Sequence, residues 1–410
     1  MHPMVKPALR RAWRGLRCVQ FGITPAHAVV MSPVTTHTGA VLGLLDGTRG
    51  MERLRAEARE LGVPDGHLEE CVDRLAASGL LADAATGRPG RAGPGAGAVD
   101  TALDPLRADL ASLSVVHREP DSAVRTLGAR RAMRVQVRGA GRVGTMVAAL
   151  LSAAGVGAVE VVDSGRVEPW ETAPGGLPAE SVGERRVTAA RRLVGRWARG
   201  FARDTGPGTG PGTGPGTGPG TSRGTGRNTG RGCPPRKDGD RGAPPLSLVV
   251  VTPRDGLGAY VPDPLPAEPW IATGTPHLYA GVVEATGTVG PLVLPGGTGC
   301  ARCLQEHLTD RQPFRPLLLA QWRSGPPHPL PACDLALATA VAGLAAAHAL
   351  AFLDGDLPAS TGTRWEVSLP LLEWRAEQLR PHPACPCGAA RGAEREGTTG
   401  ARGAQDTMAG

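Results

Sequence analysis

The sequence predicts an α/β protein. A Rossmann-like domain with a parallel sheet and a C-terminal zinc-bound region follows a small winged-helix-like α+β domain. Three observations carry this prediction. A glycine-rich turn, Gly139-Ala-Gly141-Arg-Val-Gly144, joins a short strand to a helix. Two close cysteine pairs stand far apart in the chain, at 300/303 and 385/387. The first 85 residues contain short strand patterns followed by three helical patterns.

Residues 1–85 form the predicted winged-helix-like domain. We expect strands at 18–23 and 26–31, separated by a Thr-Pro turn, and helices at 36–45, 48–61 and 64–81. An extended peptide can add as a further strand to the exposed edge of such a small sheet. The candidate peptide-binding residues are therefore those of the second strand: Ala26, His27, Ala28, Val29, Val30 and Met31.

The α/β domain is predicted to span residues 101–388, after a glycine-, alanine- and proline-rich linker at 86–100. A strand at 135–137, a helix ending near residue 154 and a strand at 158–162 form a βαβ unit. Its candidate nucleotide-binding residues are Gly139, Gly141, Gly144 and Asp163. Glycines let backbone N–H groups approach a phosphate, and a carboxylate after the second strand binds ribose. The alternative is that the glycines only permit tight packing and bind nothing.

The rest of the domain alternates between regular and irregular segments. We expect a helix at 178–201, a disordered insert at 205–245 with a repeated Thr-Gly-Pro-Gly unit, and a strand at 246–251. Two strands are expected within 281–294, around Gly287 and Gly290. The apolar stretch 335–353 is close to membrane-spanning length, but nine of its nineteen residues are alanine, so we interpret it as a buried helix. Residues 389–410 are predicted to be a disordered tail.

The cysteines at 300, 303, 385 and 387 are the candidate metal ligands. Four thiolates in two close pairs are what a tetrahedral structural zinc site requires, and such a site would tie the C-terminus back to the domain. The alternative is a redox-active pair at Cys300 and Cys303. No apolar run at the N-terminus is typical of a secretory signal, and the cysteine pattern does not indicate a disulfide framework. We therefore expect a cytoplasmic protein.

The basic residues are almost all arginine. Of 45 lysines and arginines only Lys6 and Lys237 are lysine, which excludes a Walker-type phosphate loop and leaves no evident Schiff-base site. The net charge is +7, and residues 205–245 carry six basic residues against two aspartates, or +4. The charge therefore does not indicate a nucleic-acid surface, and we expect neither nucleic acid nor membrane as a partner.

Together these residues resemble a known superfamily. The segment 139–163 followed by the paired cysteines is similar to ThiF-type adenylyltransferases, which are related to ubiquitin-activating enzymes. Four further stretches resemble the ThiF-like partner protein of YcaO-type cyclodehydratases. They are Thr275-Pro-His-Leu-Tyr, the segment 289–304, Gln321-Trp322 and His382-Pro-Ala-Cys-Pro-Cys.

The resemblance implies a function in the biosynthesis of azole-modified, bacteriocin-like ribosomal peptides. The N-terminal domain would be a leader-peptide recognition element. The implied partners are the leader of a ribosomal precursor peptide and a YcaO-type cyclodehydratase subunit, with a homodimer as a further possibility.

The sequence departs from active adenylyltransferases at the positions that handle ATP. Where those enzymes carry an asparagine and an arginine after the ribose acid, Glu171 and Pro174 stand here. Arg186 occupies the place of the phosphate-binding lysine. Val251-Thr-Pro-Arg254 stands where the magnesium-binding aspartate is expected, and Asp255 is close but displaced. Arginine keeps the charge of lysine but differs in shape and hydration. We therefore expect a degenerate nucleotide site, with structural zinc as the cofactor and no adenylation by ATP and Mg²⁺.

Two other functions stay open from the sequence. One is an active ThiF-type adenylyltransferase that acts on the C-terminus of a peptide or sulfur carrier. The other is a winged-helix DNA-binding regulator, suggested by the basic N-terminus. A zinc-like C-terminal region has no place in such a regulator.

Overall fold

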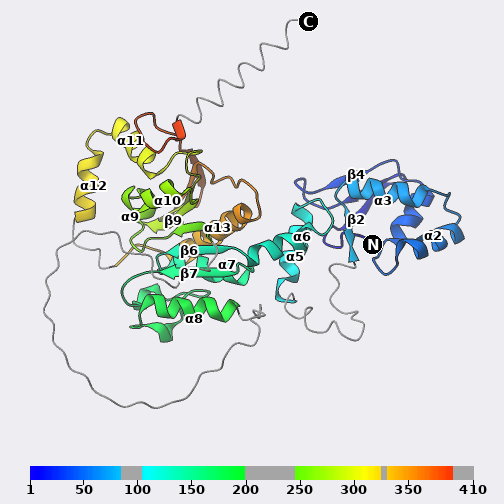
Figure 1. Cartoon of the computed structure of the whole chain (residues 1–410), viewed down its shortest axis with the longest axis horizontal. Coiled ribbons are helices and arrows are strands. Elements are labelled where there is room, and N and C mark those ends of the chain that lie inside the picture. Colours follow the sequence, from blue (N-terminus) through cyan, green and yellow to red (C-terminus); the bar gives the residue numbers. More distant parts are fainter. Residues whose placement is uncertain (85–103, 199–244, 325–329, 391–410) are drawn as a thin grey trace, which may run out of the picture.

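The computed structural model describes residues 1–84, 104–198, 245–324 and 330–390 (Figure 1). The predicted linker, nearly all of the predicted insert with Cys233, and nearly all of the predicted tail lie outside the described residues.

The N-terminal part is a small α+β module with its own hydrophobic core. Strands β2 (Arg11–Gly15), β3 (Cys18–Phe21) and β4 (Val29–Met31) form an antiparallel sheet in the order β2-β3-β4, and β1 (Pro3–Val5) pairs with β5 (Leu81–Asp83). Helices α1 (Thr36–Leu44), α2 (Met51–Glu60) and α3 (His67–Ala77) pack on them. The three predicted helices are present, with shorter bounds. The winged-helix assignment stays a prediction.

The predicted strand at 26–31 is too long, because only its last three residues pair with β3. Residues 26–28 continue the turn that begins at Thr24, whose carbonyl accepts hydrogen bonds from the amides of His27 and Ala28. Sequence patterns also missed β1, β2 and β5. These are three to five residues long, too short to show a period.

Helices α5 (Arg107–Val116) and α6 (Ser122–Arg131) connect this module to the large sheet (Figure 1). Lys6 of the N-terminal module is only 2 % exposed, and its Nζ donates to the carbonyls of His117 and Arg118 just after α5. The module is therefore hydrogen-bonded to the connecting helices.

The large sheet has seven strands in the order β12-β11-β10-β9-β8-β6-β7. Strands β7 (Ala158–Val162), β6 (Arg134–Arg138), β8 (Leu246–Val251) and β9 (His277–Val283) are parallel. Strands β10 (Thr286–Val293), β11 (Thr363–Ser368) and β12 (Trp374–Gln378) continue it antiparallel. The prediction of a parallel sheet is therefore correct for four strands and wrong for the other three.

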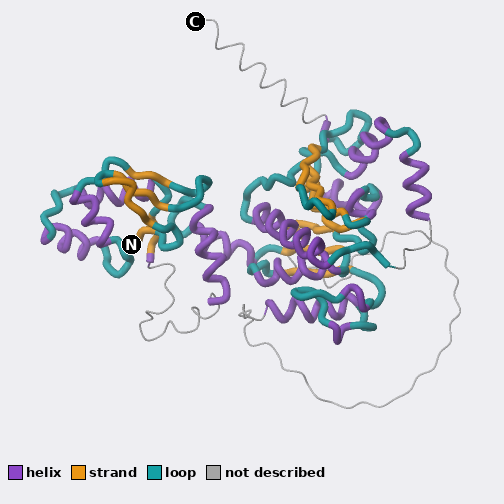
Figure 2. Tube along the Cα trace, turned by 180° about the vertical axis from the view of Figure 1, so that it is seen from behind, coloured by secondary structure: helices purple, strands orange, loops and turns teal. Residues whose placement is uncertain are grey.

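Helices cover both faces of this sheet (Figure 2). Along β8, Leu248 and Val250 join the core beneath α7 (Arg142–Ala153) and α13 (Leu335–Leu353), whereas Val249 between them faces Trp270 of α10 (Glu268–Thr273). Helix α8 (Arg186–Ala198) packs on α7 and β7, and α9 (Leu257–Tyr260) lies against β9. The predicted helix at 178–201 is interrupted, because Gly183 adopts a positive φ of 84° before α8 begins.

Helix α13 is long and apolar enough to cross a membrane by length and composition. In the fold its buried residues pack beside α7 and over β9 and β10, in agreement with the predicted buried helix. Its N-cap is Asp334, whose side chain accepts from the amide of Leu337.

The two predicted strands within 281–294 are present, but their turn lies elsewhere. Glu284 and Ala285, both with positive φ, form the turn between β9 and β10. Gly287 lies inside β10, where a Cβ atom would collide with Val341 of α13. Gly290, with a φ of 95°, lies at a bulge in the same strand. These glycines therefore serve packing and a bulge.

Candidate functional site

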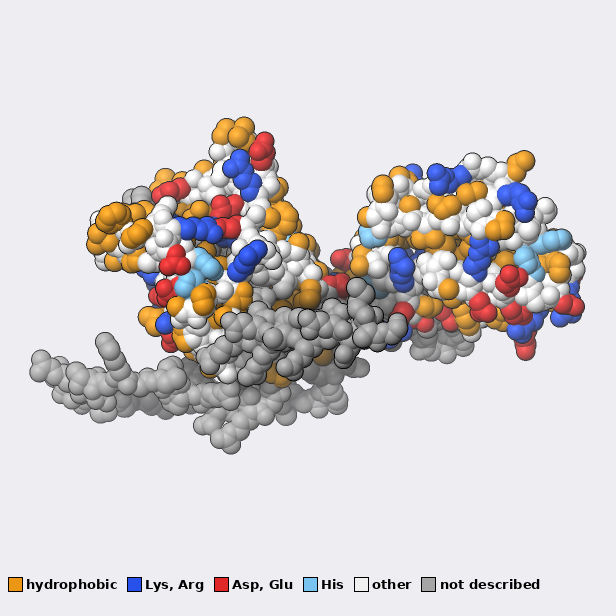
Figure 3. Space-filling model, turned by 90° about the horizontal axis from the view of Figure 1, so that it is seen from above, with side chains coloured by type: hydrophobic (Ala, Val, Ile, Leu, Met, Phe, Trp, Pro, Cys, Tyr) orange, Lys and Arg blue, Asp and Glu red, His pale blue; other side chains and the backbone are white. Residues whose placement is uncertain are grey.

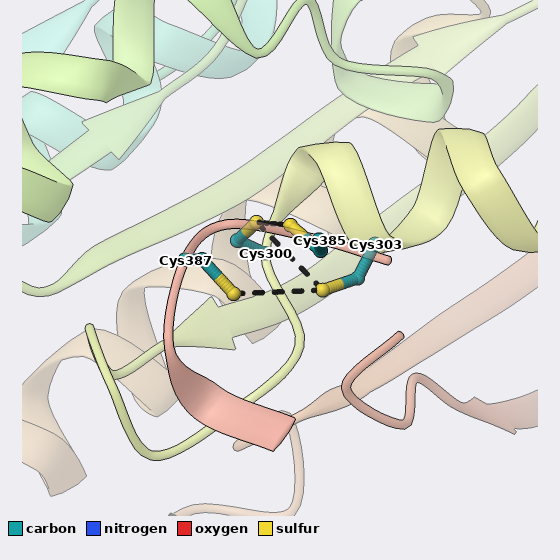
Figure 4. Close-up of side chains that lie close together, drawn as sticks. All are labelled: Cys300, Cys303, Cys385 and Cys387. Carbon is teal, nitrogen blue, oxygen red and sulfur yellow. Dashed lines mark hydrogen bonds between the residues drawn. The ribbon is translucent and has the colours of Figure 1, made fainter. Parts of the chain in front are cut away.

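The four predicted metal-ligand cysteines lie together although Cys303 and Cys385 are 82 positions apart in the sequence (Figure 4). Cys300 is the N-cap of α11 (Ala301–Arg311) and Cys303 lies in its first turn, while Cys385 and Cys387 follow β12. The Sγ–Sγ distances are 3.9 Å for 300–303, 3.6 Å for 300–385 and 3.7 Å for 303–387. Four thiolates around a zinc ion at Zn–S distances of about 2.3 Å stand about 3.8 Å apart. The cluster could therefore bind a metal such as zinc.

The backbone around the cluster favours thiolates. The amide of Cys303 hydrogen-bonds to Cys300, that of Cys387 to Cys385, and that of Ala389 to Cys387. Hydrogen bonds from Cys300 and Cys303 lower the pKa of Cys387 to about 2, whereas burial raises the pKa of Cys385 to about 11. A divalent cation bound among the four sulfur atoms would replace the thiol protons.

Two histidines form hydrogen bonds that hold the segment before the second cysteine pair. His382 Nε2 lies 2.9 Å from Asp310 Oδ2, and its Nδ1 accepts from the amide of Ala384. His307 lies one helical turn after Cys303, and its Nε2 lies 3.0 Å from the carbonyl oxygen of Arg380. Since Nδ1 of His382 is an acceptor, its Nε2 carries the proton, so this ring supports the loop and does not offer a free metal ligand.

Two of the three fingerprint glycines are required by packing alone. A Cβ atom at Gly139, whose φ is 112°, would collide with the carbonyl of Thr252, and one at Gly144 would collide with the carbonyl of Gly139. Gly141 differs, because a Cβ there would meet only Arg254, at 3.8 Å. Packing therefore accounts for the first and third glycines and leaves room in front of the second.

Both carboxylate oxygens of Asp163, the predicted ribose ligand, already accept hydrogen bonds from other residues of the chain. Its Oδ2 accepts from the amide of Ala140 at 2.6 Å, and its Oδ1 accepts from Arg186 Nη1 at 3.1 Å. Arg186 Nε also donates to Glu171 at 2.8 Å, and the other oxygen of Glu171 lies 2.6 Å from Arg254 Nε. Burial by itself would lower the pKa of Arg186, but Glu171 and Asp163 raise it. The site thus holds an internal chain of ion pairs.

Sequence reasoning did not single out Arg142 and Trp170, which lie beside this network. The arginine inside the glycine-rich turn and the Trp-Glu pair after Asp163 were the available signals.

The predicted peptide-binding residues lie at one end of the small sheet. β4 pairs with β3 on one side, and no strand of the described chain pairs with its other edge. Val30 is 46 % exposed on the outer face of this strand. Ala26, His27 and Ala28 precede β4 in the turn.

Comparison with known proteins identifies the family. The ThiF family model matches residues 123–202 and 263–387, which together make half of the chain. The chain therefore belongs to the ThiF family, in agreement with the ThiF-like, ubiquitin-activating-enzyme superfamily expected from the sequence. No curated protein matches the sequence.

Solved structures show the same fold over almost the whole chain. E. coli MccB with succinimide matches with a TM-score of 0.64 at 14 % identity, covering 95 % of this chain and 99 % of MccB. The microcin C7 biosynthetic enzyme MccB in complex with N-formylated MccA matches with a TM-score of 0.62 at 13 % identity, covering 95 % and 100 %. PaaA matches with a TM-score of 0.60 at 15 % identity, covering 92 % and 100 %.

Proposed function

We propose that this protein is a leader-peptide-binding, ThiF-like partner that presents a ribosomal precursor peptide to a YcaO-type cyclodehydratase subunit. The observation that carries the proposal is the pairing of an open edge strand in the N-terminal module with a nucleotide site closed by its own side chains. The first feature suits peptide capture. The second argues against catalysis by ATP.

Peptide capture is supported by the surface of the N-terminal module. β4 offers unpaired backbone groups to an extended peptide, which would add as a fourth strand. Figure 3 shows hydrophobic and basic side chains interspersed over this module. Its exposed large apolar residues include Trp13, Leu16, Ile23 and Val30. We therefore propose a leader whose apolar side chains alternate along the strand, with acidic residues beside them.

The ion-pair chain argues against adenylation. A nucleotide ribose would have to displace Arg186 from Asp163, whose side chain is only 7 % exposed. Arg254 stands where Mg²⁺ would need a carboxylate, and it is bound to Glu171. Transfer of an adenylyl group needs preorganised cation and phosphate ligands. The partner subunit would therefore supply the chemistry.

The connection at Lys6 supports presentation. A peptide held by a module that is fixed to the large domain samples a restricted volume, which raises its effective concentration at a docked enzyme. In MccB, whose fold is the same, a structure contains MccA. We propose that the metal centre holds the C-terminal segment of the docking scaffold and takes no part in chemistry.

The test first asks whether a short precursor gene and a YcaO-type gene lie beside this protein's own gene. It then combines the full-length protein with a fluorescent leader from that precursor and with that YcaO-type subunit. We expect the leader to bind this protein alone and the core peptide to be modified only when both proteins are present. Absence of leader binding would contradict the proposal.

An active adenylyltransferase is the second candidate, and the room in front of Gly141 is the observation that favours it. ATP–pyrophosphate exchange that depends on a peptide with a free C-terminus would establish it. We expect no exchange above the level of a Gly141→Val variant.

A further inference from the structure

A cavity of about 290 Å³ lies beside the four-cysteine cluster. It is lined by residues of α10 and by three of the four cluster cysteines, Cys300, Cys385 and Cys387. A structural zinc site is complete with four protein ligands, so no coordination position needs this space. The cavity gives small molecules access to one side of the cluster.

The cluster has a closed side and an open side. Cys303, which does not line the cavity, is fully buried in the group that it forms with Tyr279 and Val293. Cys387 lines the cavity and is only half-buried. The oxidation of a cysteine follows its thiolate character and its exposure, and a metal-bound cysteine is already a thiolate. Oxidation of the metal-loaded cluster should therefore begin at Cys387.

Each cysteine of the first pair contacts a cysteine of the second pair. Cys303 Sγ lies 3.7 Å from Cys387 Sγ, and Cys300 Sγ lies 3.6 Å from Cys385 Sγ (Figure 4). Within the first pair, the sulfur atoms are farther apart, at 3.9 Å. A disulfide bond is about 2.05 Å long, so the contacts between the pairs have the shorter distance to close.

These contacts define a balanced oxidation by hydrogen peroxide. The Cys387 thiolate attacks one oxygen of the peroxide, the O–O bond breaks, and a sulfenic acid and a hydroxide ion form. The Cys303 thiolate then attacks the Cys387 sulfur, which forms the disulfide and expels a second hydroxide ion. The two thiolates have lost two electrons, and the peroxide has gained them. A second peroxide molecule oxidises Cys300 and Cys385 in the same way.

Disulfides between the pairs would replace the metal as the connection to the C-terminal segment. A Cys303–Cys387 bond joins α11 to the chain after β12. A disulfide within each pair would release that segment. Because sulfur in a disulfide is no longer a thiolate, the metal ligands are lost while the fold keeps a cross-link.

We propose that the cysteine cluster is an oxidation site, at which hydrogen peroxide couples Cys387 to Cys303 and releases the bound metal ion. A thiol reductant reverses the step and restores the ligands. The inference goes beyond the proposed function, and it depends neither on leader binding nor on a partner subunit.

Titration of the full-length, zinc-loaded protein with hydrogen peroxide tests this proposal. A chromogenic chelator follows the released zinc, and mass spectrometry of unreduced tryptic peptides maps the disulfides. Cleavage after Arg302 separates Cys300 from Cys303, so the peptide 303–311 carries a single cysteine. We expect this peptide to be linked first to the peptide 376–391, before any thiol outside the cluster is oxidised, with release of zinc that dithiothreitol reverses.

A variant of the cavity tests the route of the peroxide. Ala272 of α10 is exposed and lines the cavity, so Ala272→Trp should fill the space without changing a ligand and slow zinc release at least about tenfold. Ala320→Trp, at an exposed alanine of α12 that does not line the cavity, should release zinc at the wild-type rate. Circular dichroism shows whether each variant folds.

Three outcomes would overturn the proposal. They are zinc that stays bound while Cys18, a thiol outside the cluster, is oxidised, a first disulfide within either cysteine pair, and equally fast zinc release by Ala272→Trp and the wild type. The disulfide map needs no variant, and it decides the pairing even in a preparation that takes up no zinc.

Discussion

Lys6 and His117 lie 111 residues apart in the sequence, and the Lys6 Nζ donates to the His117 carbonyl at 3.0 Å. Lys6 is one of only two lysines in the chain. Burial lowers the pKa of Lys6, because removing its ammonium group from water is unfavourable. The two carbonyls after α5 offset this loss of hydration by accepting hydrogen bonds from the ammonium group. A contact of this kind sets how the N-terminal module is connected to the large sheet.

Replacing Lys6 by methionine tests this connection. Lys6→Met keeps the length of the side chain but leaves the carbonyls of His117 and Arg118 without their donor, and should reduce the free energy of unfolding by about 1.5–3 kcal/mol. Urea unfolding measures the loss, and hydrogen exchange should rise at the end of α5. The exposed Arg125→Met should change stability by less than about 0.5 kcal/mol. Equal effects of the two variants would contradict the assigned role.

Arg186 is expected to be structurally essential. Arg186→Met removes the cation between two buried carboxylates and should destabilise the fold by about 3–5 kcal/mol. Arg192→Met, on the same helix, breaks the exposed pair with Glu184 and a 3.5 Å hydrogen bond to Ser181, and should cost about 0–1 kcal/mol. Thermal and urea unfolding compare the two. Similar losses would show that the ion-pair chain adds little to stability.

The metal centre should stabilise the C-terminal part of the fold. Metal analysis of the purified protein should find zinc at the cysteine cluster, and Cys300→Ser should lose it along with thermal stability. Cys333→Ser, outside the cluster, should keep the metal. Equal zinc content in wild type and Cys300→Ser would exclude this site.

His277 should make stability fall in acid. It is fully buried between Trp270 and Tyr279, and burial lowers its pKa from 6.5 to about 4. Its contribution is complete above pH 6.5 and is lost as the pH falls toward 4, because the unfolded chain binds the proton more tightly. The loss is about 3 kcal/mol. His277→Asn should flatten this part of the urea-unfolding profile, and an unchanged slope would assign the acid sensitivity to other groups.

The edge of β4 should govern peptide binding. Val30→Asp places a carboxylate at the open edge and should weaken leader binding at least about tenfold, measured by fluorescence anisotropy. Val182→Asp is the matched control, since Val182 has a similar exposure of 41 % and lies outside the N-terminal module. A leader with N-methylated backbone should also bind weakly. Equal binding by the two valine variants would move the peptide site elsewhere.

The sequence predicted helices and strands well where the apolar residues were periodic or where a glycine or proline marked the end of the element. The strand at 246–251 is observed with those bounds, and the helix after Gly141 ends within one residue of its prediction. The turn between β9 and β10 was misplaced because Glu284 and Ala285 adopt positive φ without glycine. Gly287 and Gly290, which suggested the turn, are instead required by packing against α13 and by a bulge in β10.

The cysteine cluster could be predicted because the spacing within each close pair of cysteines is visible in the sequence, whatever structure lies between the pairs. The grouping of Arg142, Trp170 and Arg254 around one cavity could not be predicted, since these residues come from segments that only the sheet brings together.

Residue types and short spacings were enough to predict the family, the βαβ unit and the cluster of four cysteines. The scarcity of lysine also showed that a phosphate-binding lysine is missing. What replaces that lysine became visible in the folded chain. Arg186 reaches both Asp163 and Glu171, and Arg254 closes the chain from the end of another strand. Such pairing depends on how parallel strands align their carboxyl ends, which no local pattern encodes.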